Sequence, residues 1–406
     1  MIKETKKAPT IRFRDFTDDW EQRKLEDFGR ATGGTSIESE FNKEGKYKVI
    51  SIGSYSENST YTDQGIRCNL TEKTQNRILN KNDLTMILND KTAVGRIIGR
   101  VLLIEQDNSY VYNQRTERIE PNKNKYDPLF LYEMLNAPGI RSKIVRQCQG
   151  NTQIYVNWPV IANQKYKIPE LKEQKIIGFF LKDLDHLITL HQRKLDQLKK
   201  LKKYFLQNMF PAKGEKVPRI RFKGFTGDWE QRKLGDIAKF INGRAYAQNE
   251  LLPSGKYKVL RVGNFYTNNS WYYSDLELDD KYYANDGDLL YTWSATFGPH
   301  IWRGDRVIYH YHIWKIDLTD KLEKRFAVQL LEQDKNDILS GHNGSTMVHI
   351  TKKGMEQKKV IIPKSIWEQR QLGLFFDNLD NLITLHQRKL NQLLTMKKFM
   401  LQNLFI

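Results

Sequence analysis

Two stretches of this chain place apolar residues at alternating steps of four and three positions. A spacing of this kind, kept over about four heptads, leaves one face of a helix apolar and is typical of a coiled-coil seam. Pro169 and Pro363 precede the stretches and Pro211 follows the first, so the sequence supplies breaks where such helices would begin and end. We expect long helices over 170–210 and 364–406. Their seam positions are Leu184, Ile188, His191, Leu195 and Leu198, then Leu379, Ile383, His386, Leu390 and Leu393.

The two stretches are copies of each other. LITLHQRKL stands unchanged at Leu187–Leu195 and at Leu382–Leu390, and a second repeated phrase, WEQRKL, begins at Trp20 and Trp229. The repeated ends enclose interiors that hardly resemble each other, and the first interior is about 15 residues longer. The chain therefore consists of two modules with a common frame and diverged interiors. Antiparallel pairing of the two helices explains their shared register best; the alternative is that each helix only packs on its own domain.

The diverged interiors alternate predicted strands with shorter helices. In the first module we expect strands over 47–55, 83–88 and 94–105 and a helix after Asp127. In the second we expect strands over 257–265, 288–293 and 300–316 and a helix over 326–331. The predicted fold class is mixed α/β: two globular domains separated by two long antiparallel helices, with an internal pseudo-twofold repeat. The predicted parts are a flexible tail 1–10, domain 11–169, helix 170–210, linker 211–219, domain 220–363 and helix 364–406.

Charge and composition favour a polyanionic partner. The chain carries a formal net charge of +18 and is 12% aromatic, a combination suited to nucleic acid. Two cysteines are too few for a disulfide framework or a thiolate metal site. The first residues are charged, and no apolar run approaches the ~18 residues of a membrane helix. We expect a cytoplasmic protein.

Polar and aromatic residues near predicted strand ends are the candidates for reading DNA. Base edges are read by amide, guanidinium, hydroxyl and imidazole groups, with aromatic rings for packing. In the first domain the candidates are Asn89, Lys91, Arg96, Asn113, Gln114, Arg115, Gln149, Asn151 and Thr152. In the second they are Asn264, Tyr266, Asn268, Trp293, Ser294, Thr296, His300, His310, His312, Asn343, Ser345 and Thr346.

The sequence contains none of the common catalytic motifs for nucleotide hydrolysis, metal-dependent hydrolysis or nucleophilic catalysis. It lacks a Walker phosphate loop, an H-E-x-x-H metal motif and a G-x-S-x-G nucleophile motif. Asp127-Pro-Leu-Phe130 superficially resembles a methyltransferase motif, but a helix N-cap followed by proline explains it better. His310 and His312 alternate as on one strand face, with no evident carboxylate to complete a site. We expect no catalytic residue, no metal and no cofactor in this chain.

The repeated phrases together resemble the specificity (S) subunit of type I restriction–modification systems. The residues that carry the resemblance are the WEQRKL phrases, the glycine turns at Gly150 and Gly344, and two segments that lead into the long helices. These segments begin at Ile168 (IPELKEQ) and Ile362 (IPKSIWEQ). Two full cycles in this order cover nearly the whole chain.

The resemblance implies a non-catalytic, DNA-binding subunit of an endonuclease and methyltransferase complex. Each of two target-recognition domains would read one half of a bipartite, asymmetric DNA site, and the helices would set the spacer. Two modification subunits, which use S-adenosylmethionine to methylate adenine, and restriction subunits, which use ATP and Mg²⁺, would assemble on it. The rival interpretations are a self-contained DNA methyltransferase or nuclease and a nucleic-acid-binding scaffold outside restriction.

Overall fold

The computed structural model describes residues 8–266, 268–294, 296–340 and 350–406. The chain divides into two units. The first comprises Met1–Gln192 together with Arg388–Ile406, and the second comprises Arg193–Gln387. Each unit therefore holds one globular domain and one half of each long helix.

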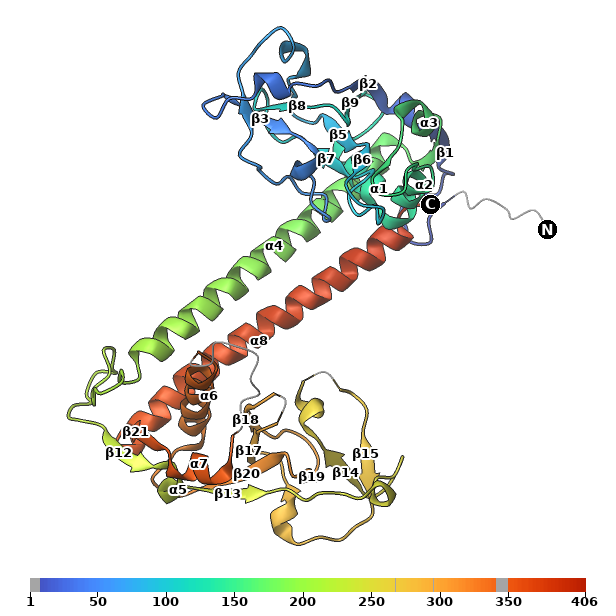
Figure 1. Cartoon of the computed structure of the whole chain (residues 1–406). Coiled ribbons are helices and arrows are strands. Elements are labelled where there is room, and N and C mark those ends of the chain that lie inside the picture. The colour runs from blue at the N-terminus through green and yellow to red at the C-terminus, as the bar shows by residue number, and fades with distance from the viewer. Residues whose placement is uncertain (1–7, 267, 295, 341–349) are drawn as a thin grey trace. The chain divides into compact units, whose positions relative to one another are not determined.

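The first unit is built on a four-stranded antiparallel sheet in the order β2-β9-β5-β7 (Figure 1). A three-stranded sheet, β4-β3-β8, and the short helices α1, α2 and α3 complete the domain. The sheet strands are β2 Gly29–Gly33, β3 Tyr47–Ile50, β4 Arg67–Cys68, β5 Leu84–Ile87, β7 Val101–Leu103, β8 Tyr110–Tyr112 and β9 Thr116–Pro121. The helices are α1 Pro128–Asn136, α2 Pro138–Val145 and α3 Trp158–Ala162.

The second unit repeats this plan with sheets β13-β20-β17-β18 and β15-β14-β19-β16. Helix α6 contacts β18 as α1 contacts β7 in the first unit. The strands are β13 Ala238–Asn242, β14 Tyr257–Leu260, β15 Tyr272–Ser274, β16 Tyr283–Ala284, β17 Leu289–Thr292, β18 Gly298–Ile301, β19 Val307–Tyr309 and β20 Ile313–Leu318. The helices are α5 Leu234–Ile237, α6 Lys324–Ser340 and α7 Lys352–Gln357.

Two 38-residue helices, α4 Leu171–Asn208 and α8 Ile366–Asn403, follow the domains. Within the first unit they run antiparallel, because Asp185 of α4 binds Lys397 of α8 while the earlier Ile177 shares a core with the later Leu404. Within the second unit Lys202 binds Asp380, and Phe205 packs on Phe375 with ring centroids 4.9 Å apart. The mixed α/β fold and the antiparallel helix pair predicted from the sequence are thus confirmed.

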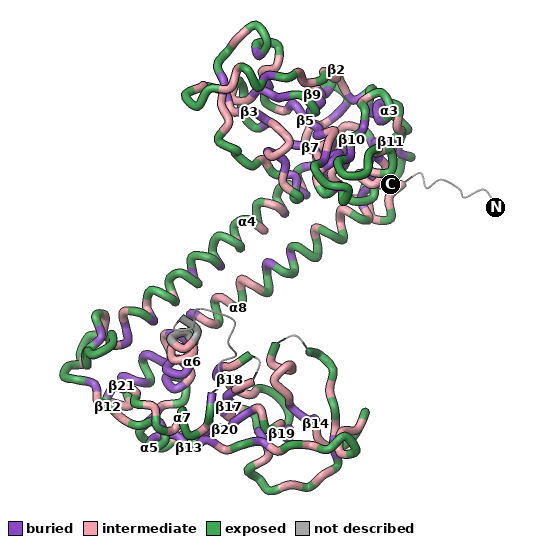
Figure 2. The backbone as a smooth tube through the Cα atoms, viewed as in Figure 1, coloured by how far each residue is buried: buried purple, intermediate pink, exposed green. Residues whose placement is uncertain are grey.

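The seam positions lie along the less exposed stripe of the two helices. Six of them are buried, and the other four, Ile188, His191, Ile383 and His386, are half-buried. The buried positions are Leu184, Leu195, Leu198, Leu379, Leu390 and Leu393. In the first unit the stripe comes from 184–191 and 390–393, and in the second from 195–198 and 379–386. Figure 2 shows that the remaining surface of both helices is largely exposed.

The repeated phrases close each domain and join it to its long helix. WEQRKL places a buried Trp20 before strand β1 (Glu21–Lys24), which pairs antiparallel with β11 (Lys165–Ile168), and Trp229 precedes the equivalent pair. That pair is β12 (Glu230–Lys233) with β21 (Lys359–Ile362).

A glutamate at the start of each long helix holds the segment that leads into the domain. The guanidinium group of Arg12 donates two hydrogen bonds to Glu173, whose side chain is fully buried. Arg221 binds Glu368 in the same way, and the indole Nε1–H of Trp229 also donates to Glu368, at 3.2 Å. We call these two ion pairs the frame clamps. Because the same arginine–glutamate pair holds the leading segment in both modules, both residues of the pair are repeated.

A glutamine next to each clamp satisfies backbone groups at the domain exit. The side chain of Gln174 donates to the carbonyls of Pro169 and Lys125 and accepts from the backbone N–H of Asp127. Gln369 repeats all three bonds in the second unit. Asp127 itself caps α1 by accepting from the backbone N–H of Phe130, so its predicted role as an N-cap is confirmed.

Four strand predictions were wrong in extent. The strand predicted over 47–55 ends at Ile50, and a 3-10 turn follows at Ile52–Ser54. Residues 94–100 form turns rather than a strand, and only Val101–Leu103 is extended, because Gly95 and Gly99 have φ of +66° and +72°. The predicted strand over 257–265 ends at Leu260. The predicted strand over 300–316 is interrupted twice, so His310 and His312 lie in a turn and not on one strand face.

Candidate nucleic-acid interface

Several segments meet at one end of the four-stranded sheet in the first domain. Strands β2 and β5 finish there and β9 begins, since Gly33 pairs with Glu117 and Ile87 with Thr116. The backbone of Leu88 also donates to the carbonyl of Arg115. We call this edge, with its connecting loops, the loop end of the domain.

The structure brings the sequence-predicted residues of the first domain to this loop end. The turn between β8 and β9 contains Asn113, Gln114 and Arg115. The connection from β5 to β7 begins with strand β6 (Asn89–Asp90), which pairs with β10 (Ile154–Tyr155) and so brings the turn after Gln149 alongside. Seven of the predicted DNA-reading residues are exposed at the loop end: Lys91, Arg96, Gln114, Arg115, Gln149, Asn151 and Thr152.

The connection between β5 and β7 is a braced loop that accounts for part of the extra length of the first module. Leu84 pairs with Leu103, 19 positions on, whereas in the second domain Leu289 pairs with Ile301, only 12 positions on. The carboxylate of Asp90 accepts from the backbone of Thr92 and of Ile97. The half-buried guanidinium group of Arg141 donates to the carbonyls of Gly95 and Ile98. These bonds hold the exposed cations Lys91 and Arg96 on a fixed backbone.

Asn113 differs from its neighbours because its amide is used inside the protein. Its Oδ1 accepts from the backbone N–H groups of Ile37 and Gln114, and its Nδ2 donates to Glu38 at 2.9 Å. Glu38 also accepts from Ser36 and Gln114, and these bonds lower the pKa of Glu38 to about 2. Asn113 therefore supports the turn, and the exposed Gln114 beside it is the better candidate for contact with DNA.

The second domain gathers its candidates at the equivalent end of its sheet. Thr292 at the end of β17 pairs with both Ile313 and Gly298. The same end holds the turn between β19 and β20, with His310 and His312, and the segment after β14. Candidates from these loops are Asn264, Tyr266, Asn268, Trp293, Ser294, Thr296 and His300.

Aromatic and imidazole rings dominate the loop end of the second domain. His300 stacks on Phe265 with centroids 4.1 Å apart, and its Nε2 lies 3.1 Å from the hydroxyl of Tyr266. The rings of His310, Tyr311 and His312 form one cluster: those of His310 and His312 lie 4.4 and 3.9 Å from that of Tyr311 and 5.0 Å from each other. Burial lowers the pKa of His300 and of His310 to about 4, so both rings are neutral at physiological pH. They can donate or accept a hydrogen bond but carry no charge to a phosphate.

Several residues at the loop ends were not anticipated from the sequence. Glu38 in the first domain and Arg244, Tyr246 and Tyr311 in the second lie beside the predicted residues. A signal for them existed: Gly34 and Gly243 occupy repeat-equivalent positions before these loops. Of the predicted residues, Asn343, Ser345 and Thr346, together with the turn at Gly344, lie outside the described residues.

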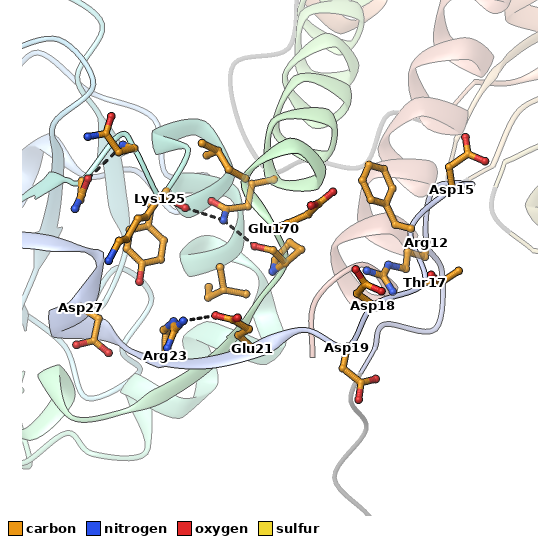
Figure 3. A pocket seen from close by; sticks show the side chains of 18 residues that line it. Arg12, Asp15, Thr17, Asp18, Asp19, Glu21, Arg23, Asp27, Lys125 and Glu170 are labelled. Atoms are coloured by element: carbon orange, nitrogen blue, oxygen red, sulfur yellow. Dashed lines mark hydrogen bonds and ion pairs between the residues drawn. The ribbon is translucent and has the colours of Figure 1, made fainter.

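A cavity in the described part of the first unit has the wrong charge for DNA. It has a volume of about 770 Å³ and lies where the leading segment meets β1, β11 and the start of α4 (Figure 3). Six carboxylates line it against three cations, so it repels phosphate. The carboxylates are Asp15, Asp18, Asp19, Glu21, Asp27 and Glu170.

No group of three or more His, Cys, Asp and Glu side chains within the ranges given above is arranged to hold a metal ion. None of the helices in those ranges is long and apolar enough to cross a membrane.

The comparisons with known proteins define the class of this protein. Residues 17–200 and 226–395 both match the family model of the type I restriction modification DNA specificity domain. The chain therefore belongs to the family of type I restriction–modification specificity subunits. Subunits of this kind carry the DNA recognition of their complex and are not its catalytic components.

The chain is similar to other specificity subunits over most of their length. The chain is 23% identical to the type I restriction enzyme MjaVIII specificity subunit of Methanocaldococcus jannaschii, covering 94% of this chain and 91% of that protein. It is 25% identical to a putative type I restriction enzyme MjaX specificity subunit of the same organism, over 74% of this chain and 73% of that one. The fold is similar to that of the S subunit from M. genitalium, with a TM-score of 0.67, 16% identity and coverage of 98% and 99%.

Proposed function

We propose that each domain reads one half of a bipartite DNA site through its loop end, and that the two halves differ in sequence. The observation that carries this proposal is the gathering of candidate readers at the same sheet end in both domains. The two ends expose different chemistry: amides and cations in the first domain, and aromatic and imidazole groups in the second. Because different side chains recognise different base edges, an asymmetric site follows.

The proposal extends to partner subunits, which would dock on the long helices. Among the exposed apolar side chains of α4 and α8, eight that are 41 to 61% exposed form two repeat-equivalent sets. One set, in the first unit, is Leu187 and Leu190 with Met396 and Phe399; the other, in the second unit, is Leu382 and Leu385 with Leu201 and Tyr204. We call these sets the helix patches. Apolar side chains exposed in this way are typical of interaction sites, and two equivalent sets suit two copies of one partner.

The partners in this proposal are two modification subunits and the restriction subunits of the complex. The modification subunits would use S-adenosylmethionine to methylate adenine, and the restriction subunits would use ATP and Mg²⁺. The whole complex would act on DNA in the cytoplasm, with the continuous helices α4 and α8 setting the spacer between half-sites.

The decisive experiment is to express the chain with candidate modification subunits and to sequence methylated adenines in the host genome. We expect a two-part, asymmetric motif with a fixed gap, and we expect no methylation when this chain is omitted. Transfer of methyl groups by the purified chain alone would contradict the proposal, as would methylation without a gapped motif.

A further inference from the structure

The turn between β8 and β9 of the first domain and the turn between β19 and β20 of the second share one backbone framework. In each domain a glycine passes so close to the turn that a Cβ would lie about 2 Å from a backbone oxygen: Gly34 against Asn113, at 2.0 Å, and Gly243 against His310, at 2.3 Å. No other residue type fits there without a shift of the backbone.

The hydrogen bonds around the two turns repeat as well. The backbone N–H of Asn113 donates to Ile50, and that of His310 donates to Leu260, both at 2.9 Å. Next to each turn a tyrosine hydroxyl lies close to a carbonyl of β2 or β13: Tyr112 donates to Thr32, at 3.3 Å, and the hydroxyl of Tyr309 lies 3.5 Å from Ile241 while its shorter bond, at 2.6 Å, goes to Lys281. Gln114 and Tyr311 therefore occupy the same position on the same scaffold, directly after the anchored residue.

The two side chains at this position are both exposed and chemically unlike. Gln114 donates through Nε2 to Oε1 of Glu38 at 3.1 Å, which orients its amide and leaves its second N–H and its Oε1 available to a ligand. Tyr311 is 39% exposed, and its ring contacts those of His310 and His312, which also contact each other with centroids 5.0 Å apart. A shared scaffold that presents different side chains is the arrangement required to read different bases at one position.

We infer that Gln114 and Tyr311 are specificity-determining residues, each for one base pair of its own half-site. This inference rests on the proposed reading of DNA by the loop ends. An oriented glutamine amide matches the donor and acceptor pair on the major-groove edge of adenine. Tyr311, held by its ring neighbours, offers an apolar ring face, which suits the methyl group of thymine. Glu38 acts as a positioning residue, because it accepts a hydrogen bond from the amide of Gln114 and so orients it, while Glu38 itself lies outside the turn.

The test uses the full chain assembled with its modification subunits and a DNA library in which both half-sites are randomised. Gln114→Ala should reduce the preference for one base of the first half-site by about 5- to 150-fold, the range for one good bidentate contact, and leave the second half-site unchanged. Tyr311→Ala should do the same at one base of the second half-site only. Lys123→Ala, an exposed change at the opposite end of the first sheet, is the matched control and should alter no base preference.

The role of Glu38 has its own readout. Glu38→Ala should weaken the preference at the same base as Gln114→Ala, whereas Glu38→Gln, which keeps an acceptor, should restore most of it. Unchanged melting temperatures would show that the variants are folded. If the wild-type chain directs a gapped motif and Gln114→Ala and Tyr311→Ala leave every position of it unaltered, this inference is overturned while the proposed function stands. If the wild-type motif has no two-part form, the proposed function fails instead.

Discussion

The ammonium group of Lys397 donates to both carboxylate oxygens of Asp185, at 2.6 Å each, and its repeat equivalent Lys202 binds Asp380 in the same way. The first pair lies in the first unit and the second pair in the second. Each is partly exposed, so each contributes at most about 1 kcal/mol. Their main effect is to fix the register of the two helices. Repeat-equivalent residues pair α4 with α8 in both units, and this is possible only when the helices run antiparallel.

The frame clamps should be unequal in strength. Arg12→Ala leaves the buried carboxylate of Glu173 without its donor, and loss of one partner of a buried pair costs about 3 kcal/mol or more. Arg221→Ala should cost less, because the indole of Trp229 still donates to Glu368. The indole of Trp20, by contrast, has no hydrogen-bond partner within the residues that the structure describes. Native-state hydrogen exchange, read separately for each unit, measures both losses.

A surface ion pair of the same frame provides the control for the clamps. Arg23 binds Glu21, and both side chains are largely exposed. Arg23→Ala should therefore cost less than about 1 kcal/mol. Equal losses for Arg12→Ala and Arg23→Ala would show that the clamp does not stabilise the unit.

Glu133 should make the stability of the first unit depend on pH. Burial raises the pKa of Glu133 to about 7, against an opposing effect of Lys397 and a reinforcing effect of Asp185. Between the ordinary carboxyl pKa, near 4.5, and 7 the folded state binds more protons than the unfolded state, so stability falls as pH rises through this window. Glu133→Gln should remove this fall, of the order of 2 kcal/mol, as measured by hydrogen exchange of α1 at pH 5 and pH 7.5.

The second unit contains a matched test of the same effect. Gln329 is buried on α6 beside Asp380, where Glu133 lies beside Asp185. Gln329→Glu should introduce a fall in the stability of α6 with rising pH.

Burial also raises the pKa of Glu117 to about 7, so Glu133→Gln should remove only part of the pH dependence of the first domain. A pH profile that Glu133→Gln leaves unchanged would refute the assignment.

The helix patches should each hold one modification subunit. Leu190→Ser with Phe399→Ser should remove one subunit from the complex, and Leu385→Ser with Tyr204→Ser should remove the other, because each pair removes apolar area from one set only. Native mass spectrometry reports the number of subunits bound. Lys398→Ala, an exposed change beside Phe399, should leave two. Loss of both subunits from either pair would argue against two separate docking sites.

The two domains should read DNA independently. Replacing Ala31–Gln149 by the corresponding interior of another specificity subunit keeps β1, β11 and the frame clamp and exchanges most of the loop end. We expect a new first half-site, with the second half-site and the gap unchanged, as judged by sequencing methylated adenines. A change in both halves would exclude independent reading.

The sequence by itself determined the duplicated frame, the two long helices and the family. These features depend on local periodicity and on short phrases whose residues act nearby: Asp127 caps the helix that follows it, and the seam is a property of each helix. The tertiary structure alone decided how the interiors are used. The strand predicted over 300–316 proved to contain two turns. The first falls at the polar residues 303–306, where Gly304 has a φ of +135°, and the second separates β19 from β20, which occupy different sheets.

Only the fold could separate readers from supports among the candidate residues. Asn113 and Gln114 are adjacent amides with the same propensity for DNA bases, yet one is turned inward to the backbone of Ile37 and the other outward. That difference depends on Gly34 and Glu38, some 75 positions earlier in the chain. Contacts between residues so far apart leave no local pattern in the sequence, which is why the positions of the proposed readers emerged only from the packed domain.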